Sequence, residues 1–279
     1  MVKKLAPLFL IVGLCLLEGR AEAIRPFVTD DARIADQGQL ELEIIPDLIF
    51  PRGERALFEQ SLIASFGILP SFELGVGGAI GINHGDGASF GNPELSAKLL
   101  FIRADPSGIP GVALVLAAAL PYGRGVLYSP GTALNLIAPL TSHLFGGALL
   151  IHLNVGLIVG IPREDRSRAI HPYAGLGVDV SLGLEGLRFV GEIYSGEPFA
   201  PWSSRVATQA GGRYEFNERF NLDLVFGASP SEAGKRFRDG SDLWVQLGVR
   251  LLFDAFRKTP GDPDGGAGLF KNRAMRTGS

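Results

Sequence analysis

Histidines are the side chains that most readily serve acid–base or metal chemistry near neutral pH. The chain has four, at positions 84, 143, 152 and 171, and they are scattered without the short spacing of a metal-binding motif. His84 and His143 fall in expected connections between elements, as does the GDG stretch at 85–87, where a turn is favoured over a phosphate cradle. The sequence therefore predicts neither a metal site nor a cofactor.

A larger set of polar side chains alternates with apolar residues and is expected to face one enclosed lumen. It holds eight acids and five bases together with histidines, amides and tyrosines, namely Glu41, Glu43, Glu73, Glu94, Lys98, His152, Asn154, His171, Tyr173, Asp179, Arg188, Glu192, Tyr194, Arg205, Gln209, Arg213, Glu215, Asp223 and Arg250. Charges in a confined interior need partners, so the first interpretation is mutual pairing. The second is that Arg188, Arg205 and Arg213, set against Glu192 and Glu215, line a path for a solute.

The β-strand is the element expected to position these side chains. Residues 72–83, FELGVGGAIGIN, alternate large apolar residues with small or polar ones. Similar alternation predicts twelve strands, near 38–50, 56–69, 72–83, 92–103, 110–120, 132–140, 147–160, 169–182, 187–196, 204–217, 220–228 and 242–254. Most reach the roughly 9 to 11 residues that a tilted strand needs to cross a bilayer.

The connections between these strands alternate in length. Tight links at 70–71, 105–108, 141–146, 183–186 and 217–219 alternate with longer polar ones such as 121–131, 161–168 and 229–241. This is typical of an all-β, up-and-down antiparallel barrel in an outer membrane, with short periplasmic turns and long outer loops. Closure leaves no unpaired strand edge in lipid. A soluble barrel or sandwich is the alternative, but one small core would not hold the apolar residues of twelve strands.

The first 23 residues have the form of a signal peptide. Two lysines precede an apolar run at 5–17, and the AEA at 21–23 is a small-x-small cleavage site. Cys15 follows a bulky leucine, which argues against lipidation, and cleavage would leave no cysteine. Because the leader carries three basic and two acidic residues, its removal takes the net charge from −3 to −4. A mildly acidic chain argues against a nucleic-acid partner.

Four regions are expected along the chain: a signal peptide at 1–23, a periplasmic lead-in at 24–37, the barrel at 38–254 and a disordered tail at 255–279, which is rich in Gly, Pro and charge. In the last strand, Gln246, Gly248, Leu251 and Phe253 resemble the C-terminal signal by which outer-membrane barrels are handed to their assembly machinery. We therefore expect a location in the outer membrane of a Gram-negative cell. The expected partners are lipid, that machinery and a small-molecule solute.

The stretch PFVTDDARIADQGQLELEI at 26–44 resembles the start of the outer-membrane family named for the meta-pathway of phenol degradation. The matching residues are Pro26, Thr29, Asp30, Asp31, Gly38 and Glu41. The resemblance implies an outer-membrane channel or transporter and supplies no catalytic residue and no defined substrate. Asp30 and Asp31 either anchor the lead-in at the periplasmic rim, since Asp caps turns, or belong to a plug in the barrel mouth.

Acyl-ester hydrolysis is the remaining chemistry to test. The stretch HLNVG at 152–156 weakly resembles the His-x-x-Asn-Gly-x-Ser motif of outer-membrane phospholipase, but the Asn is displaced and Ile158 stands where the serine is needed. We expect no enzyme, but passive passage of small molecules, hydrophobic or aromatic ones included, through a narrow lumen. Twelve strands fall between filled eight-stranded barrels and open porins. The alternatives are a sealed structural or adhesive barrel and, with less support, a lipid hydrolase.

Overall fold

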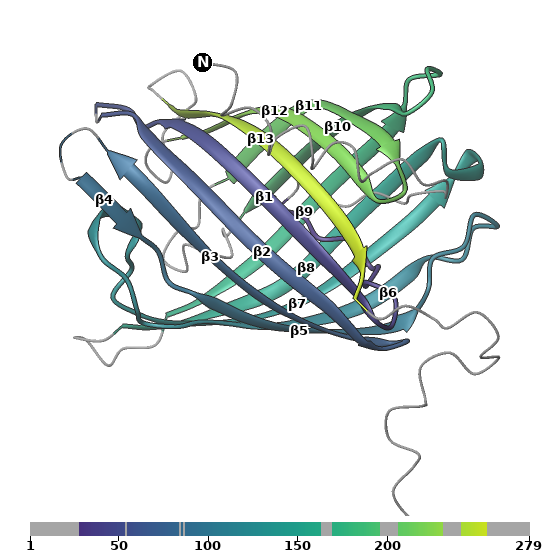
Figure 1. Cartoon of the computed structure of the whole chain (residues 1–279), viewed down its shortest axis with the longest axis horizontal. Helices are drawn as coiled ribbons and strands as arrows, with labels where there is room; N and C mark the ends of the chain where they lie inside the picture. Colours follow the sequence, from purple (N-terminus) through teal and green to yellow (C-terminus); the bar gives the residue numbers. More distant parts are fainter. Residues whose placement is uncertain are drawn as a thin grey trace, which may run out of the picture.

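The computed structural model describes residues 28–53, 55–83, 85, 87–162, 169–195, 206–230 and 241–255. These residues are mostly β-strand (Figure 1): β1 Gln39–Phe50, β2 Leu57–Leu69, β3 Phe72–Asn83, β4 Gly87–Phe90, β5 Glu94–Ile102, β6 Gly111–Ala119, β7 Gly131–Leu144, β8 Leu149–Pro162, β9 Ala169–Ser181, β10 Leu187–Ser195, β11 Val206–Asn217, β12 Phe220–Pro230 and β13 Ser241–Asp254. Two single-turn 3-10 helices, η2 Gly125–Leu127 and η3 Phe145–Gly147, lie in connections. Within the described ranges no helix is long and apolar enough to cross a membrane.

All the strands except β4 join into one closed antiparallel barrel of twelve. Closure is made by β1, which pairs with β2 on one side and with β13 on the other, so that Leu40 faces both Phe66 and Phe253. Strand β4 adds four residues beside one end of β3, and β3 continues the ring by pairing with β5. Figure 1 shows the strands crossing the barrel obliquely, as closure requires. The all-β twelve-stranded barrel predicted from alternation is confirmed.

Two elements differ from the expectation. Strand β7 continues through Thr141 and His143, which keep the inward alternation and are 4% and 6% exposed, so His143 lies in a strand and not in a connection. The turn falls later, where Gly146 and Gly147 have φ of 66° and 90°, a backbone that glycine adopts at no steric cost. Strand β4 was not predicted, because four residues are too few for an alternating pattern to stand out from a loop.

The outer face of the barrel is apolar. On β3, Leu74, Val76, Ile80 and Ile82 are 42% to 62% exposed, whereas Asn83, on the opposite face, is 8% exposed. Large apolar side chains on the other strands are exposed in the same way. An apolar surface of this extent would drive aggregation in water but suits hydrocarbon.

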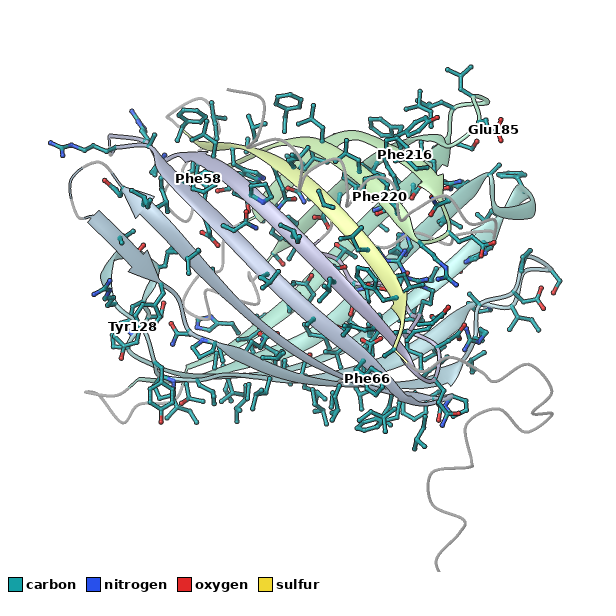
Figure 2. All side chains as sticks on the ribbon, in the orientation of Figure 1. Phe58, Phe66, Tyr128, Glu185, Phe216 and Phe220 are labelled. Carbon is teal, nitrogen blue, oxygen red and sulfur yellow. The ribbon has the colours of Figure 1, made fainter. Side chains whose placement is uncertain are left out.

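Aromatic side chains gather toward the ends of the strands. Figure 2 shows Phe58 toward one end of the barrel, and Phe66, Phe216 and Phe220 toward the other. At the turn between β11 and β12, the Phe216 ring stacks on Phe220 and meets Tyr214 edge-on, with centroids 4.7 Å apart in both pairs. Aromatic girdles at the two interfaces are typical of outer-membrane barrels.

Candidate functional site

The barrel interior is occupied by residues 28–37, which we call the N-terminal segment. Thr29, Ala32 and Ile34 are only 1% to 2% exposed. The segment contacts β1, β3, β5, β7, β8 and β10, strands on every side of the ring, and therefore lies inside it (Figure 1). The lead-in expected in the periplasm is thus within the barrel from Val28 onward. A sequence pattern does not show this, because the wall that surrounds the segment forms only on closure.

Polar side chains of the wall bind the main chain of this segment. The Glu192 carboxylate accepts hydrogen bonds from the backbone N–H groups of Val28 and Thr29, both at 2.8 Å. Asn154 makes two bonds to Asp30: its Oδ1 accepts from the backbone N–H at 2.7 Å and its Nδ2 donates to the backbone carbonyl at 2.6 Å. The Tyr173 hydroxyl donates to the carbonyl of Val28 at 3.1 Å. These bonds satisfy buried backbone groups that no strand reaches.

Two further wall residues bind the part of the segment that is nearer to β1 in the sequence. Thr141 Oγ1 accepts from the backbone N–H of Ala32 at 2.9 Å, and Glu73 Oε2 accepts from that of Ala35 at 2.5 Å. The segment then ends at Gly38, whose φ of 83° makes the turn into β1. Gly38 also links the start of β1 to the end of β13, since its carbonyl accepts from the backbone N–H of Ala255 at 2.9 Å.

Ion pairs add to this attachment. Lys98 Nζ lies 3.0 Å from Asp30 Oδ1 and 3.7 Å from Asp31 Oδ1. Arg33 Nη2 lies 3.1 Å from Glu41 Oε2, and the same oxygen is 2.6 Å from Arg250 Nη2. Burial raises the pKa of Asp31 to about 6, although Lys98 and Arg33 act to lower it. Burial of the ionised carboxylate of Asp31 therefore carries a desolvation free energy, which protonation removes.

A second charged cluster joins β9, β10, β11 and β12. Arg213 Nη1 lies 2.8 Å from Asp179 Oδ2, and Arg213 Nε lies 2.7 Å from Asp223 Oδ1, with all three side chains at most 1% exposed. Asp179 also accepts from Arg188, whose Nε is 3.9 Å from Glu215 Oε1. Arg188 and Arg213 face each other across β10 and β11, so Asp179 separates two like charges. This cluster is the mutual pairing given above as the first interpretation.

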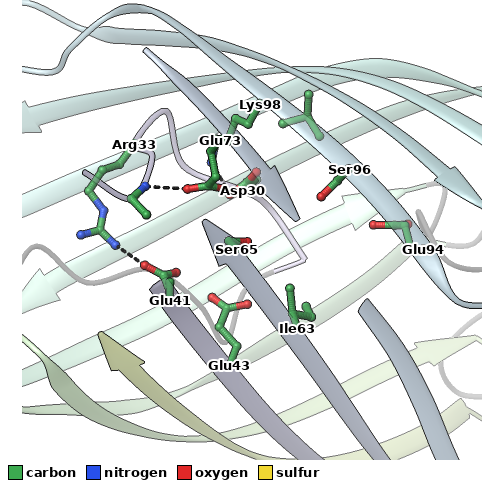
Figure 3. A pocket seen from close by; sticks show the side chains of 12 residues that line it. Asp30, Arg33, Glu41, Glu43, Ile63, Ser65, Glu73, Glu94, Ser96 and Lys98 are labelled. Atoms are coloured by element: carbon green, nitrogen blue, oxygen red, sulfur yellow. Dashed lines mark hydrogen bonds and ion pairs between the residues drawn. The ribbon is translucent and has the colours of Figure 1, made fainter. Parts of the chain in front are cut away.

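A cavity of about 70 Å³ remains between the N-terminal segment and the wall of β1, β2, β3, β5 and β6. Figure 3 shows carboxylates converging on it from both the segment and the wall. Its charged lining consists of Asp30, Glu41, Glu43, Glu73 and Glu94 with the two cations Arg33 and Lys98. The space left beside the segment is therefore small and acidic.

The remaining lumen candidates face the same interior. Fully buried members of the predicted set are Glu41, Glu43, Lys98, His152, Asn154, Tyr173, Asp179, Glu192, Tyr194, Gln209, Arg213, Asp223 and Arg250. Half-buried members are Glu73, Glu94, His171, Arg188 and Glu215. Arg205, one of the residues predicted to line a path for a solute, lies outside the described residues. Of the other residues predicted to line that path, Glu192 binds the N-terminal segment and Gln209, and not one of the predicted arginines.

The residues tested for hydrolysis are engaged inside the barrel. His152 is 2% exposed and its Nδ1 lies 3.0 Å from Thr141 Oγ1, while Asn154 binds Asp30. Both point away from the outer, lipid-facing surface. Among the described residues, no group of three or more His, Cys, Asp or Glu is arranged to hold a metal ion.

One terminal motif lies inside the barrel and the other lies in its last strand. Thr29, Asp30 and Asp31 are in the N-terminal segment, and Pro26 is outside the described residues. Strand β13 carries Gln246 and Gly248 on its inward face, with Leu251 and Phe253 alternating to the outer face, where Phe253 is 43% exposed. The motif of the last strand is thus in the strand that meets β1. Of the tail, only its first residue, Ala255, is described.

Among the interior residues that sequence reasoning missed, three are informative. Thr141 is one, and extending the alternation of 132–140 by one residue would have found it. Arg33 and Asn221, which is 1% exposed, are the others. Asn221 follows the inward parity of Asp223 and was open to prediction, whereas nothing in the pattern of residues 28–37 indicates that Arg33 meets Glu41.

Comparison with known proteins gives a family and a fold. The family model described as "Uncharacterised conserved protein UCP029691" matches residues 12–253. The chain belongs to this family. No curated protein matches it.

Three solved structures illustrate the likeness in fold. The COG4313 outer membrane channel from Pseudomonas putida F1 is 12% identical, with a TM-score of 0.56 over 83% of this chain and 100% of that one. The NanC porin is 13% identical, with a TM-score of 0.54 over 75% and 98%. The KdgM porin in complex with disordered oligogalacturonate is 8% identical, with a TM-score of 0.52 over 76% and 99%. At these identities the likeness establishes the outer-membrane barrel fold of the family member described here.

Proposed function

We propose that this protein resides in the outer membrane and is a channel for small solutes, without covalent chemistry. The observation that carries the proposal is the division of side chains: a closed ring of twelve strands is apolar outside and charged inside. A soluble β-protein places its apolar side chains inward instead. The fold shared with a channel and two porins supports the same conclusion.

The solutes that we propose are small and include hydrophobic or aromatic molecules. Lumen-facing aromatic side chains support this class: Tyr173, Tyr194 and Trp244, the last of which donates from its Nε1 to Gln209 Oε1 at 2.8 Å. Rings of this kind offer apolar area together with a polar edge. The resemblance to the phenol meta-pathway family remains a prediction, because the comparisons lend it no support. Lipid and the barrel-assembly machinery remain the proposed partners.

A sealed structural barrel is the second candidate. It is favoured by the N-terminal segment, which occupies the interior, and by the small size of the cavity beside it. A lipid hydrolase has no comparable support from the positions of His152 and Asn154. It predicts ester hydrolysis that one serine substitution abolishes.

The test has two steps. Electrophoresis of the outer-membrane fraction, unboiled against boiled, should show a heat-dependent shift because a closed barrel resists detergent when cold. Purified protein in liposomes should then release small aromatic and aliphatic solutes faster than liposomes with boiled protein. A folded soluble species in the periplasm would overturn the location, and a shift without flux would favour the sealed barrel.

A further inference from the structure

The side chains of the lumen wall contact mainly the main chain of the N-terminal segment. Glu192 binds two successive N–H groups, Asn154 binds the N–H and the carbonyl of one residue, and Tyr173 binds one carbonyl. Thr141 binds a fourth N–H. Contacts to backbone groups are the same for any extended peptide, whereas side-chain contacts depend on sequence. The wall of β7 to β10 therefore has the properties of a peptide-binding site.

The strand ladder of the barrel does not include this occupant. Every pairing that closes the ring joins one strand to another. Within the described ranges, no backbone–backbone hydrogen bond involves residues 28–35. Departure of the segment would break its bonds to side chains and leave the strand ladder intact.

The other side of the segment borders a cavity. The space of about 70 Å³ lies between the segment and the wall of β1, β2, β3, β5 and β6. Three side-chain interactions hold the segment on this side, from Arg33 to Glu41, from Ala35 to Glu73 and from Lys98 to Asp30. Two of these three are ion pairs between side chains, so the contacts to the main chain lie chiefly on the wall of β7 to β10.

We propose that residues 28–35 are a tethered ligand of a main-chain-binding site formed by Glu192, Asn154, Thr141 and Tyr173, and that the segment leaves this site to open the channel. An untethered extended peptide binds the same site when it is vacant. The opening step rests on the proposed channel function, but the binding site does not.

A disulfide can hold the segment in place. A Cβ built on Gly177 lies 3.7 Å from Thr29 Cβ and meets no atom closer than 3.5 Å, within the roughly 3.5–4.5 Å that disulfides span. The Thr29→Cys/Gly177→Cys variant, oxidised, should conduct at least tenfold less in planar bilayers than when reduced. The two single variants, treated identically, should not respond to the redox reagent.

The outcomes separate the inference from the proposed function. Equal conductance in the oxidised and reduced states would overturn the opening step. If no form conducts, the proposed function fails, and modification of Thr29→Cys by a maleimide still tests departure of the segment. Labelling no faster than that of Gly177→Cys would mean that the segment stays in place.

The peptide site is tested with acetyl-VTDDARIADQ-amide, the sequence of residues 28–37. A fluorescently labelled copy should bind the detergent-solubilised protein saturably, measured by fluorescence anisotropy, and Glu192→Gln should weaken this binding about tenfold or more, since one acceptor of the carboxylate becomes a donor facing an N–H. The control is the same peptide N-methylated at its Thr and at its first Asp, the counterparts of Thr29 and Asp30, whose N–H groups bind Glu192 and Asn154; it should not bind. Equal binding of the methylated peptide, or no binding of either, would overturn the site.

Discussion

Removal of Arg213 should destabilise the barrel far more than removal of a comparable surface arginine. Arg213 is fully buried and bridges Asp179 and Asp223, so Arg213→Ala leaves two carboxylates in the interior without one of their cations. Breaking a buried pair in this way costs about 3–5 kcal/mol. Arg219 is the matched control: its pair with Asp254 is 2.6 Å long but 42% exposed on both sides, and Arg219→Ala should cost about 0–1 kcal/mol.

The free energy of unfolding can be measured by denaturant titration of protein refolded in micelles, followed by tryptophan fluorescence. Arg213→Met combined with Asp223→Asn should recover part of the loss, because it removes a carboxylate along with its cation. Equal, small losses for Arg213→Ala and Arg219→Ala would refute the reasoning. That result would mean that water solvates the cluster and that the pairing adds little.

Acidification should favour the bound state of the N-terminal segment. The pKa of Asp31 is about 6 in the lumen against 3.8 in water, so stability of the bound state is gained as pH falls through 6 and is complete below about 4. Conductance at pH 5 should thus be lower than at pH 7.5, and Asp31→Asn should reduce that difference. Asp30, Lys98 and Arg33 also face this site. If the pH dependence of conductance is the same in Asp31→Asn as in the unaltered protein, Asp31 is not the group responsible. Gly67→Ala should loosen the segment, because a Cβ there would overlap the carbonyl oxygens of residues 35 and 36. Thr29→Cys should then label faster, whereas the control Gly77→Ala, whose Cβ would make only ordinary contacts with Ile63 and Leu62, should leave the rate unchanged.

The strands could be predicted because each one separates lipid from lumen. In β3 this demand places a large apolar residue on one face and Gly, Ala or Asn on the other, which is visible in one sequence. In β7 the same rule would have carried the strand to Thr141 and His143. The tight link predicted at 141–146 is wrong in its position, because Thr141 and His143 keep the inward register of the strand.

The binding of the N-terminal segment could not be predicted in the same way. Glu192 and Asn154 were expected in the lumen on parity, but their partners are main-chain atoms, which carry no sequence pattern. Asp30 and Asp31 were open to two interpretations, since Asp serves a turn as well as an ion pair. Only the closed ring brings Lys98 within 3.0 Å of Asp30.

The threaded position of the N-terminal segment sets an order of events in folding. Its bonds from Val28 to Glu192 and from Ala32 to Thr141 join residues 164 and 109 positions apart. Contacts so distant in sequence form late, because a long loop must close first. The site that binds the segment is formed by β7, β8, β9 and β10, and the ring closes where β1 pairs with β13. The segment must therefore be enclosed at that moment or enter through an end of the finished ring, and residues translated early are among the last to reach their final positions.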